Sequence, residues 1–166
     1  SEFMLVAAMN PTPDGKTPSE SNSTPREIQN YLGRISGPLL DRIDLHIEVP
    51  PVKFREMSSS NSGETSAVIR ERVLKARGIQ NLRWSGSPTC NARMQSRDLQ
   101  TWCTMDDITQ NLLRRAMEEL ELSARAYDRI LKVSRTIADL ADSQTITVEH
   151  VSEAIQYRTL DRQIRT

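Results

Sequence analysis

Three polar or cationic side chains stand where predicted elements of structure begin or end. Asn10 directly follows an apolar run, Arg42 precedes a run of alternating apolar and polar residues, and Arg125 lies just inside a predicted helix. A guanidinium is a planar fork of donors that matches the oxygens of a phosphate or a carboxylate. Arginines in these places indicate anion recognition, unless acids on the same surface already neutralise them.

Arg42 has acidic residues close to it on both sides, Asp41 and Asp44. The run that follows, Ile43 to Val49, has the alternation of a half-buried strand. Burying a charged side chain at the start of a strand costs free energy unless a partner compensates the charge. Arg42 is therefore either paired locally with Asp41 or Asp44, which contributes little energy, or it has a partner elsewhere.

Arg125 follows Ser123, a residue type that caps helices. A cation at a helix N-terminus is unfavourable to the helix dipole, so its presence there asks for an anionic partner such as a phosphate. Glu121 or Asp128 could equally supply that partner, and Arg125 would then belong to an ordinary solvated helix face. The local sequence leaves both interpretations open.

The overall composition excludes a strong electrostatic preference. The chain of 166 residues has 22 Lys and Arg against 22 Asp and Glu, so its net charge predicts neither a nucleic-acid-binding protein nor an enzyme for acidic substrates. Its 37% hydrophobic content is enough for one compact domain or two small ones. Nearly all the cations are arginines, and the few lysines are Lys16, Lys53, Lys75 and Lys132.

The cysteines and histidines do not have the spacing of a zinc site. Cys90 and Cys103 are far in sequence from His46 and His150. A disulfide between the two cysteines is possible on paper, but no secretory signal or long hydrophobic span is present, which indicates a reduced, cytoplasmic setting.

The first part of the chain alternates predicted strands with loops. Phe3 to Met9 is an unbroken apolar run, typical of a strand buried on both faces of a parallel sheet. Thr24 to Glu27 has the form of a capping box with proline at the first helical position, which predicts a short helix through about Leu32. The strand Ile43 to Val49 ends at Pro50 and Pro51.

After an exposed linker the apolar period changes from two to about 3.6 residues, which predicts a small helical bundle. Helices are expected over 66 to 77, over 106 to 121, after Ser123, and after Thr147. Ile69, Val73 and Ala76 form the expected apolar stripe of the first of these helices. Ile146 and Val151 have the spacing of a hydrophobic staple around the Thr147 cap.

Three separated motifs in this order carry a resemblance to a known family. They are LVAAMNP at 5 to 11, RISGPLLDRIDLHIEVP at 34 to 50, and LSARAYDRILKVSRTIADL at 122 to 140. Together they closely resemble the C-terminal half of bacterial magnesium-chelatase-like AAA+ ATPases, a family that includes a competence-associated DNA helicase. The resemblance covers nearly the whole chain.

The resemblance implies roles for the polar residues described above. Asn10 matches the first sensor, which could orient the attacking water, whereas the plain interpretation is a turn that leaves a strand. Arg42 matches an arginine finger that reaches in trans to the γ-phosphate of a neighbouring subunit, with Arg34 as the weaker alternative. Arg125 matches the second sensor on a helical lid, with Arg129 as the alternative.

The resemblance also implies a domain organisation. We expect a mixed α/β remnant of an AAA+ parallel-sheet core over 1–54, a linker over 55–65, an all-α helical lid over 66–160 and a tail over 161–166. The implied partners are the N-terminal ATPase half of the same protein, neighbouring subunits of a homo-oligomeric ring, and DNA on family analogy. No membrane partner is expected.

Two departures from the family pattern limit what this chain can do alone. Relatives often carry Cys-Pro-Cys-Gly in the loop after the first sensor, but this chain has Thr12 to Gly15 there, so zinc binding is not expected. The phosphate loop G-x-x-x-x-G-K-[ST] and an apolar strand ending in paired acids are both absent. ATP and Mg²⁺ are therefore expected in a full-length parent, and the fragment is expected to be inactive without its other half. The competing hypothesis is a non-enzymatic helical module that binds protein or nucleic acid.

Overall fold

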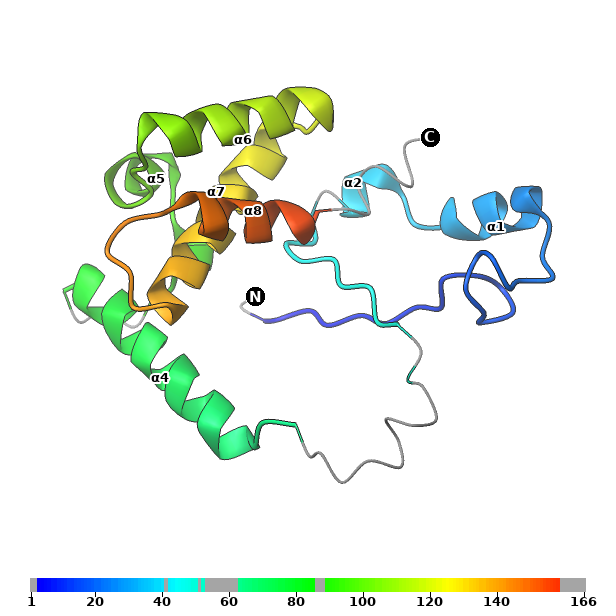
Figure 1. Cartoon of the computed structure of the whole chain (residues 1–166), viewed down its shortest axis with the longest axis horizontal. Helices are drawn as coiled ribbons and strands as arrows, with labels where there is room; N and C mark the ends of the chain where they lie inside the picture. The colour runs from blue at the N-terminus through cyan, green and yellow to red at the C-terminus, as the bar shows by residue number, and fades with distance from the viewer. Residues whose placement is uncertain (1–2, 41, 51, 53–62, 86–88, 159–166) are drawn as a thin grey trace. The chain divides into compact units, whose positions relative to one another are not determined.

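The computed structural model describes residues 3–40, 42–50, 52, 63–85 and 89–158. The chain divides into two units: the first contains the described residues up to Arg42, and the second contains those from Ile43 onward. All regular secondary structure within these described residues is helical (Figure 1). The predicted linker falls largely on residues that the structure does not describe, and the predicted tail 161–166 lies wholly outside the described residues.

The first unit contains the two short helices α1, Pro25–Leu32, and α2, Gly37–Leu40. The predicted capping box at the start of α1 is confirmed. The backbone N–H of Glu27 donates to Thr24 Oγ1 at 3.3 Å, and the backbone N–H of Thr24 donates to Glu27 Oε2 at 2.7 Å. These reciprocal bonds satisfy two backbone donors, which explains why the helix begins here.

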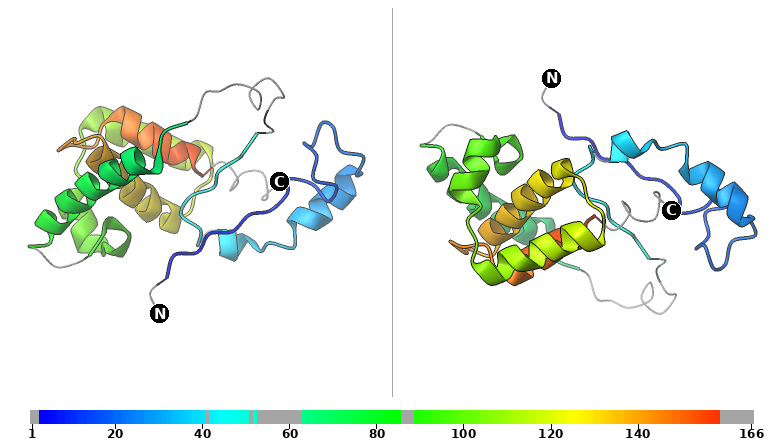
Figure 2. Two further views of the ribbon diagram at one scale, coloured as in Figure 1. Left: turned by 90° about the horizontal axis from the view of Figure 1, so that it is seen from below. Right: turned by 90° about the horizontal axis from the view of Figure 1, so that it is seen from above.

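The two segments predicted as strands, 3–9 and 43–49, are not strands in the structure. Figures 1 and 2 show residues 3–10 and 44–50 as irregular traces. Val6 is 79% exposed and Ile47 is 66% exposed. A strand is stabilised by hydrogen bonds to a neighbouring strand, and no described segment pairs with either run in this way. The apolar pattern predicted a strand, but the pattern does not supply the partner.

The second unit contains five α-helices and a 3₁₀ turn within its described residues. They are α4, Ser66–Arg83; η1, Asn91–Arg93; α5, Ser96–Trp102; α6, Asp107–Glu119; α7, Ala124–Leu140; and α8, Val148–Gln156. Thr65, Asp106 and Ser123 cap α4, α6 and α7 by accepting a backbone N–H with their side chains. The helical bundle predicted from the 3.6-residue period is therefore confirmed. None of the described helices combines the length and the apolar character needed to cross a membrane.

The core of the second unit is built around α7. This helix packs against α8, α4, α5 and η1, and α8 also packs against α6. The buried apolar cluster consists of Met94, Leu99, Cys103, Leu113, Ile130, Leu131, Ala138, Ile146, Val151 and Ala154. Ile146 and Val151 are both buried beside the α8 cap, which confirms the predicted staple.

The helix α4 departs from its predicted burial. Ala76 is buried as expected, but Ile69 and Val73 are 42% and 46% exposed. The apolar residues of α4 are spread around the helix and do not form one buried stripe. Val68 and Leu74 are exposed as well. Only the C-terminal half of α4 therefore contributes buried residues to the core.

A buried polar network joins α4, η1 and α7. Asp139 of α7 is 1% exposed and accepts hydrogen bonds from Arg83 Nη2 at 2.6 Å, from Arg135 Nε at 3.0 Å and from Asn91 Nδ2 at 2.8 Å. Arg135 also donates to the backbone oxygens of residues 143 and 144, which lie between α7 and α8. Buried charges need such partners, so these contacts fix how the three elements meet.

Candidate functional site

Arg125 is the second residue of α7 and is exposed at the N-terminal end of that helix. The helix begins here because Ser123 Oγ accepts a hydrogen bond from the backbone N–H of Ala126 at 3.2 Å. The first turn of α7 contains no acidic residue. Ser123 and the core beneath Ala126, which is 1% exposed, therefore hold the backbone that carries Arg125.

The guanidinium of Arg125 makes no hydrogen bond or ion pair within the described part of the chain. Among the described residues, Glu121 and Asp128, the alternative partners predicted from the sequence, form no hydrogen bond or ion pair with it. A cation beside the positive end of a helix dipole is unfavourable unless an anion joins both. The first turn of α7 therefore carries backbone N–H groups and an exposed arginine, two kinds of donor that suit phosphate oxygens.

Arg129, one turn further along α7, has a different environment. Its Nη1 atom forms an ion pair with Asp44 Oδ1 at 2.5 Å, and its side chain is only 22% exposed. The two residues are 85 positions apart in the chain, so no local sequence pattern indicates this pair. Asp44, one of the two acids expected to neutralise Arg42, is thus the partner of Arg129.

Arg42, Arg34 and Asn10 belong to the first unit. Arg42 is exposed, and its Nη1 atom donates to the backbone oxygen of Pro38 at 2.7 Å, one turn earlier in the chain. Asp41, the other predicted partner of Arg42, lies outside the described residues. Arg34 and Asn10 are also exposed. Arg125 and Arg129 belong to the second unit.

The loop after Asn10 is closed by its own side chains. Asp14 accepts hydrogen bonds from Thr12 Oγ1 at 2.7 Å, Ser21 Oγ at 2.8 Å and the backbone N–H of Asn22 at 3.0 Å. These bonds, the one from Thr12 above all, hold the pKa of the Asp14 carboxyl well below its usual range. Gly15 follows with a φ of +78°, a conformation that favours glycine.

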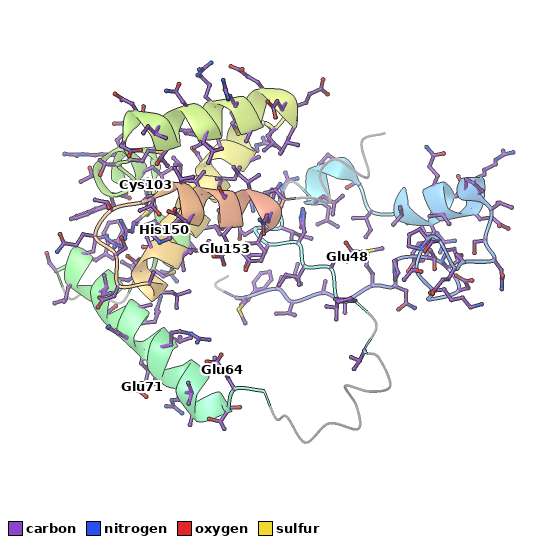
Figure 3. All side chains as sticks on the ribbon, in the orientation of Figure 1. Glu48, Glu64, Glu71, Cys103, His150 and Glu153 are labelled. Carbon is purple, nitrogen blue, oxygen red and sulfur yellow. The ribbon has the colours of Figure 1, made fainter. Side chains whose placement is uncertain are left out.

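Metal-binding residue types do not gather in the part of the chain that the structure describes. No group of three or more His, Cys, Asp or Glu side chains lies close enough there to hold a metal ion. Figure 3 shows His150 and Glu153 on α8, whereas Cys103 follows α5 and Glu71 lies on α4. Cys103 is buried, which raises the pKa of its thiol to about 11, and both cysteines are free.

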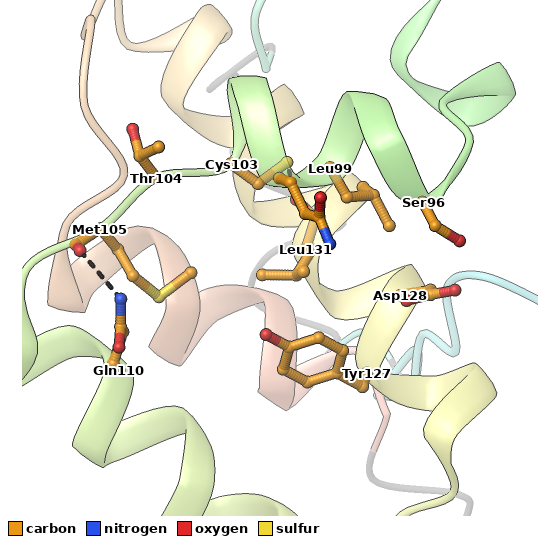
Figure 4. A pocket seen from close by; sticks show the side chains of 10 residues that line it. Ser96, Leu99, Cys103, Thr104, Met105, Gln110, Tyr127, Asp128 and Leu131 are labelled. Carbon is orange, nitrogen blue, oxygen red and sulfur yellow. Dashed lines mark hydrogen bonds between the residues drawn. The ribbon is translucent and has the colours of Figure 1, made fainter.

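A groove of about 440 Å³ lies beside the first half of α7 (Figure 4). Tyr127, Asp128 and Leu131 of α7 line it together with residues of α5 and the segment before α6. On its rim, Gln110 Nε2 donates to the backbone oxygen of Met105 at 3.3 Å. Arg125 is not among the described residues that line this groove, so the groove and the exposed guanidinium are separate features.

Comparison with known proteins identifies the family. Residues 63–158 match the model of the C-terminal region of magnesium chelatase subunit ChlI, and residues 1–57 match the model of magnesium chelatase subunit ChlI. The chain is 46% identical over 162 residues to the competence protein ComM of Haemophilus influenzae and 41% identical over 162 residues to the uncharacterized protein YifB of Escherichia coli. An uncharacterized protein of Mycobacterium tuberculosis is 33% identical over 159 residues.

These alignments cover most of the chain but little of the relatives. The match to ComM covers 96% of this chain and 31% of ComM, and the match to the mycobacterial protein covers 94% of this chain and 31% of that relative. The C-terminal family model alone covers more than half of the chain. On these matches and on its helical second unit, the chain belongs to the magnesium chelatase subunit ChlI family.

Proposed function

We propose that the chain works within a longer AAA+ ATPase, for which it supplies the first sensor, an arginine finger and a helical lid with the second sensor. The observation that carries this proposal is Arg125, whose exposed guanidinium has no partner among the described residues at a helix end without acidic residues. The family match supplies the expectation of ATP and Mg²⁺ in the parent protein.

Phosphoryl transfer requires little covalent chemistry from the protein and much charge neutralisation and positioning. Arg125 is suited to bind the phosphates of a nucleotide held in the same subunit, because a guanidinium and helix N–H groups can bind separate oxygens. Arg129 is a poorer candidate for this role, since its guanidinium is engaged with Asp44. Bound ATP with Mg²⁺ supplies the transferable phosphoryl group.

The arginines of the chain are suited to bind the phosphates of a nucleotide. The chain does not supply the paired acids that would hold the magnesium ion. Its sequence contains no phosphate loop and no strand ending in paired acids. We infer that those elements belong to the other part of the parent protein. Joined to them, the run 3–9 would gain neighbouring strands in the α/β core.

Arg42 is proposed as the finger that acts in trans on the nucleotide of the next subunit in a homo-oligomeric ring. Arg42 is exposed, and its hydrogen bond to the backbone oxygen of Pro38 lies at the surface, where a phosphate can compete for the guanidinium. A finger arginine stabilises the charge that develops in the transition state and contributes about 10³-fold or more to turnover. Asn10, the exposed residue after the first apolar run, would orient the attacking water.

Turnover in the full-length protein tests the finger. Arg42→Ala should lower ATP turnover by about 10³-fold without changing assembly, because the lost interaction forms only in the transition state. Arg34→Ala is the matched control, since Arg34 is an exposed arginine of the same unit. Normal turnover in Arg42→Ala, or an equal loss in Arg34→Ala, would contradict the assignment of the finger to Arg42.

A second candidate function is a helical interaction module that needs no nucleotide. The observation that favours it is the exposed apolar surface of α4, with Val68, Val73 and Leu74 between 46% and 58% exposed. For a nucleic-acid partner, binding would weaken steeply as salt rises, because phosphate contacts release counterions. If the chain does not bind DNA, or if its DNA affinity does not depend on salt, the result favours the ATPase proposal over a nucleic-acid-binding module. Because the relative ComM is named a competence protein, DNA is the first client to test for the parent protein.

A further inference from the structure

We propose that residues 43–46 form a clasp which makes the position of Arg42 follow the position of the helical lid. The clasp consists of contacts from Ile43, Asp44 and His46 to α7 and to the end of α8. This inference rests on the proposed function, because it assigns a purpose to the contacts only if Arg42 is the finger and Arg125 the second sensor.

Three contacts define the clasp, and all lie within the second unit. Arg158, just beyond α8, donates from its guanidinium to the backbone oxygen of Ile43. The backbone N–H of His46 donates to the backbone oxygen of Tyr157 at 2.8 Å. Between them, Asp44 forms its ion pair with Arg129 of α7.

The clasp is anchored on its lid side. His46, at one end of the segment, is 6% exposed, and Arg158, which holds the backbone oxygen of Ile43 at the other end, is 2% exposed. Exposed ion pairs are weak alone, and Asp44 is 61% exposed. A pair held between two buried contacts is already oriented, so it loses less conformational freedom when it forms. The three contacts together fix the register of residues 43–46 on the lid.

The clasp connects Arg42, the proposed finger, to the helix that carries Arg125, the proposed second sensor. Arg42 immediately precedes Ile43, and Arg125 lies one helical turn before Arg129 on the rigid helix α7. If α7 moves when Arg125 binds a nucleotide, the ion pair and the backbone contacts carry residues 43–46 with it. Arg42 would then change its reach toward the neighbouring site. Asp44 and Arg129 are positioning residues in this scheme, and the scheme couples adjacent sites in a ring.

Hydrogen exchange of this chain tests whether the clasp is cooperative. Asp44→Asn should speed exchange of the His46 amide by about two- to five-fold, the range expected for an exposed ion pair. The matched control is Asp142→Asn, which removes the carboxylate of another exposed, long-range pair in the same unit, formed with Lys75 at 2.7 Å. An unchanged His46 rate in Asp44→Asn, or an equal change in the control, would overturn the clasp.

Cooperativity of ATP turnover tests its purpose in the full-length ring. Asp44→Asn and Arg129→Gln should each lower the Hill coefficient toward one and lower maximal turnover by about two- to five-fold, and the exchanged pair Asp44→Arg with Arg129→Asp should restore both. Nucleotide affinity and thermal stability should stay within two-fold and within a few degrees of wild type. These last readouts separate positioning from simple destabilisation.

Comparison with Arg42→Ala separates this inference from the proposed function. If Arg42→Ala abolishes turnover while the Asp44 and Arg129 variants leave the Hill coefficient unchanged, the finger stands and the clasp has no coupling role. If Arg42→Ala leaves turnover unchanged, the proposed function fails, whatever the clasp variants do. Failure of the exchanged pair to restore cooperativity would also overturn the coupling role.

Discussion

Removal of the Asp139 carboxylate should strongly destabilise the helical unit. Asp139 is 1% exposed and is the shared acceptor of Arg83, Arg135 and Asn91. The side chains of Arg83 and Arg135 are themselves only 7% and 3% exposed. The variant Asp139→Ala would leave two guanidinium groups buried without their anion.

The expected cost follows from this geometry. Breaking a buried ion pair by removing one partner costs about 3–5 kcal/mol. For a unit of roughly 100 residues, each kcal/mol shifts the melting temperature by about 4–8 °C, so the melting temperature should fall by more than about 10 °C. Asp139→Asn keeps the volume and loses the charge. We expect an intermediate loss, because the amide oxygen can still accept the hydrogen bonds made to one of the two carboxylate oxygens.

Thermal and urea unfolding of the chain, followed by circular dichroism at 222 nm, measures these losses. Asp142→Asn is the control, since Asp142 pairs with Lys75 on the surface, where both side chains are more than half exposed. Its cost should stay below about 1 kcal/mol. If Asp139→Ala unfolds within 1 kcal/mol of wild type, the buried network does not hold α4, η1 and α7 together.

Three further predictions follow from local contacts. Ser123→Ala should cost about 1 kcal/mol in unfolding experiments, because the α7 cap loses its acceptor, and Ser123→Asn should retain most of the stability. Asp14 should remain ionised well below pH 3.8 in an NMR titration of its carboxyl carbon. Its hydrogen bonds favour the charged form. Their contribution to the stability of the loop is therefore present above pH 3.8 and is lost as the pH falls through the lowered pKa. Iodoacetamide should alkylate the half-buried Cys90 well before Cys103, since a pKa near 11 instead of 9.0 lowers the thiolate fraction of Cys103 about 100-fold; comparable rates for the two would contradict this.

Helix positions were largely predictable from the sequence because their signals are local. Thr24 and Ser123 begin their helices as predicted, since a capping side chain needs only a partner two or three residues away. The short helix α5 was missed because its seven residues carry too little periodic pattern. The predicted strands required neighbours that an apolar pattern cannot identify.

The candidate site was only partly predictable for the same reason. The sequence suggested Arg125 and Arg129 as alternatives, and only the structure separates them, because the partner of Arg129 lies 85 residues away. The pair between Arg83 and Asp139 spans 56 residues and has no local signature. Long-range polar contacts of this kind depend on how helices pack, and periodicity does not record which charged residues will meet.

The most direct test of the proposed function is ATP turnover by this chain mixed with a separately expressed N-terminal half that contains the phosphate loop. We predict turnover only on mixing, with large losses in both Arg42→Ala and Arg125→Ala while the halves still associate. Turnover that is absent from folded, associated halves, or that is indifferent to both arginines, would contradict the account.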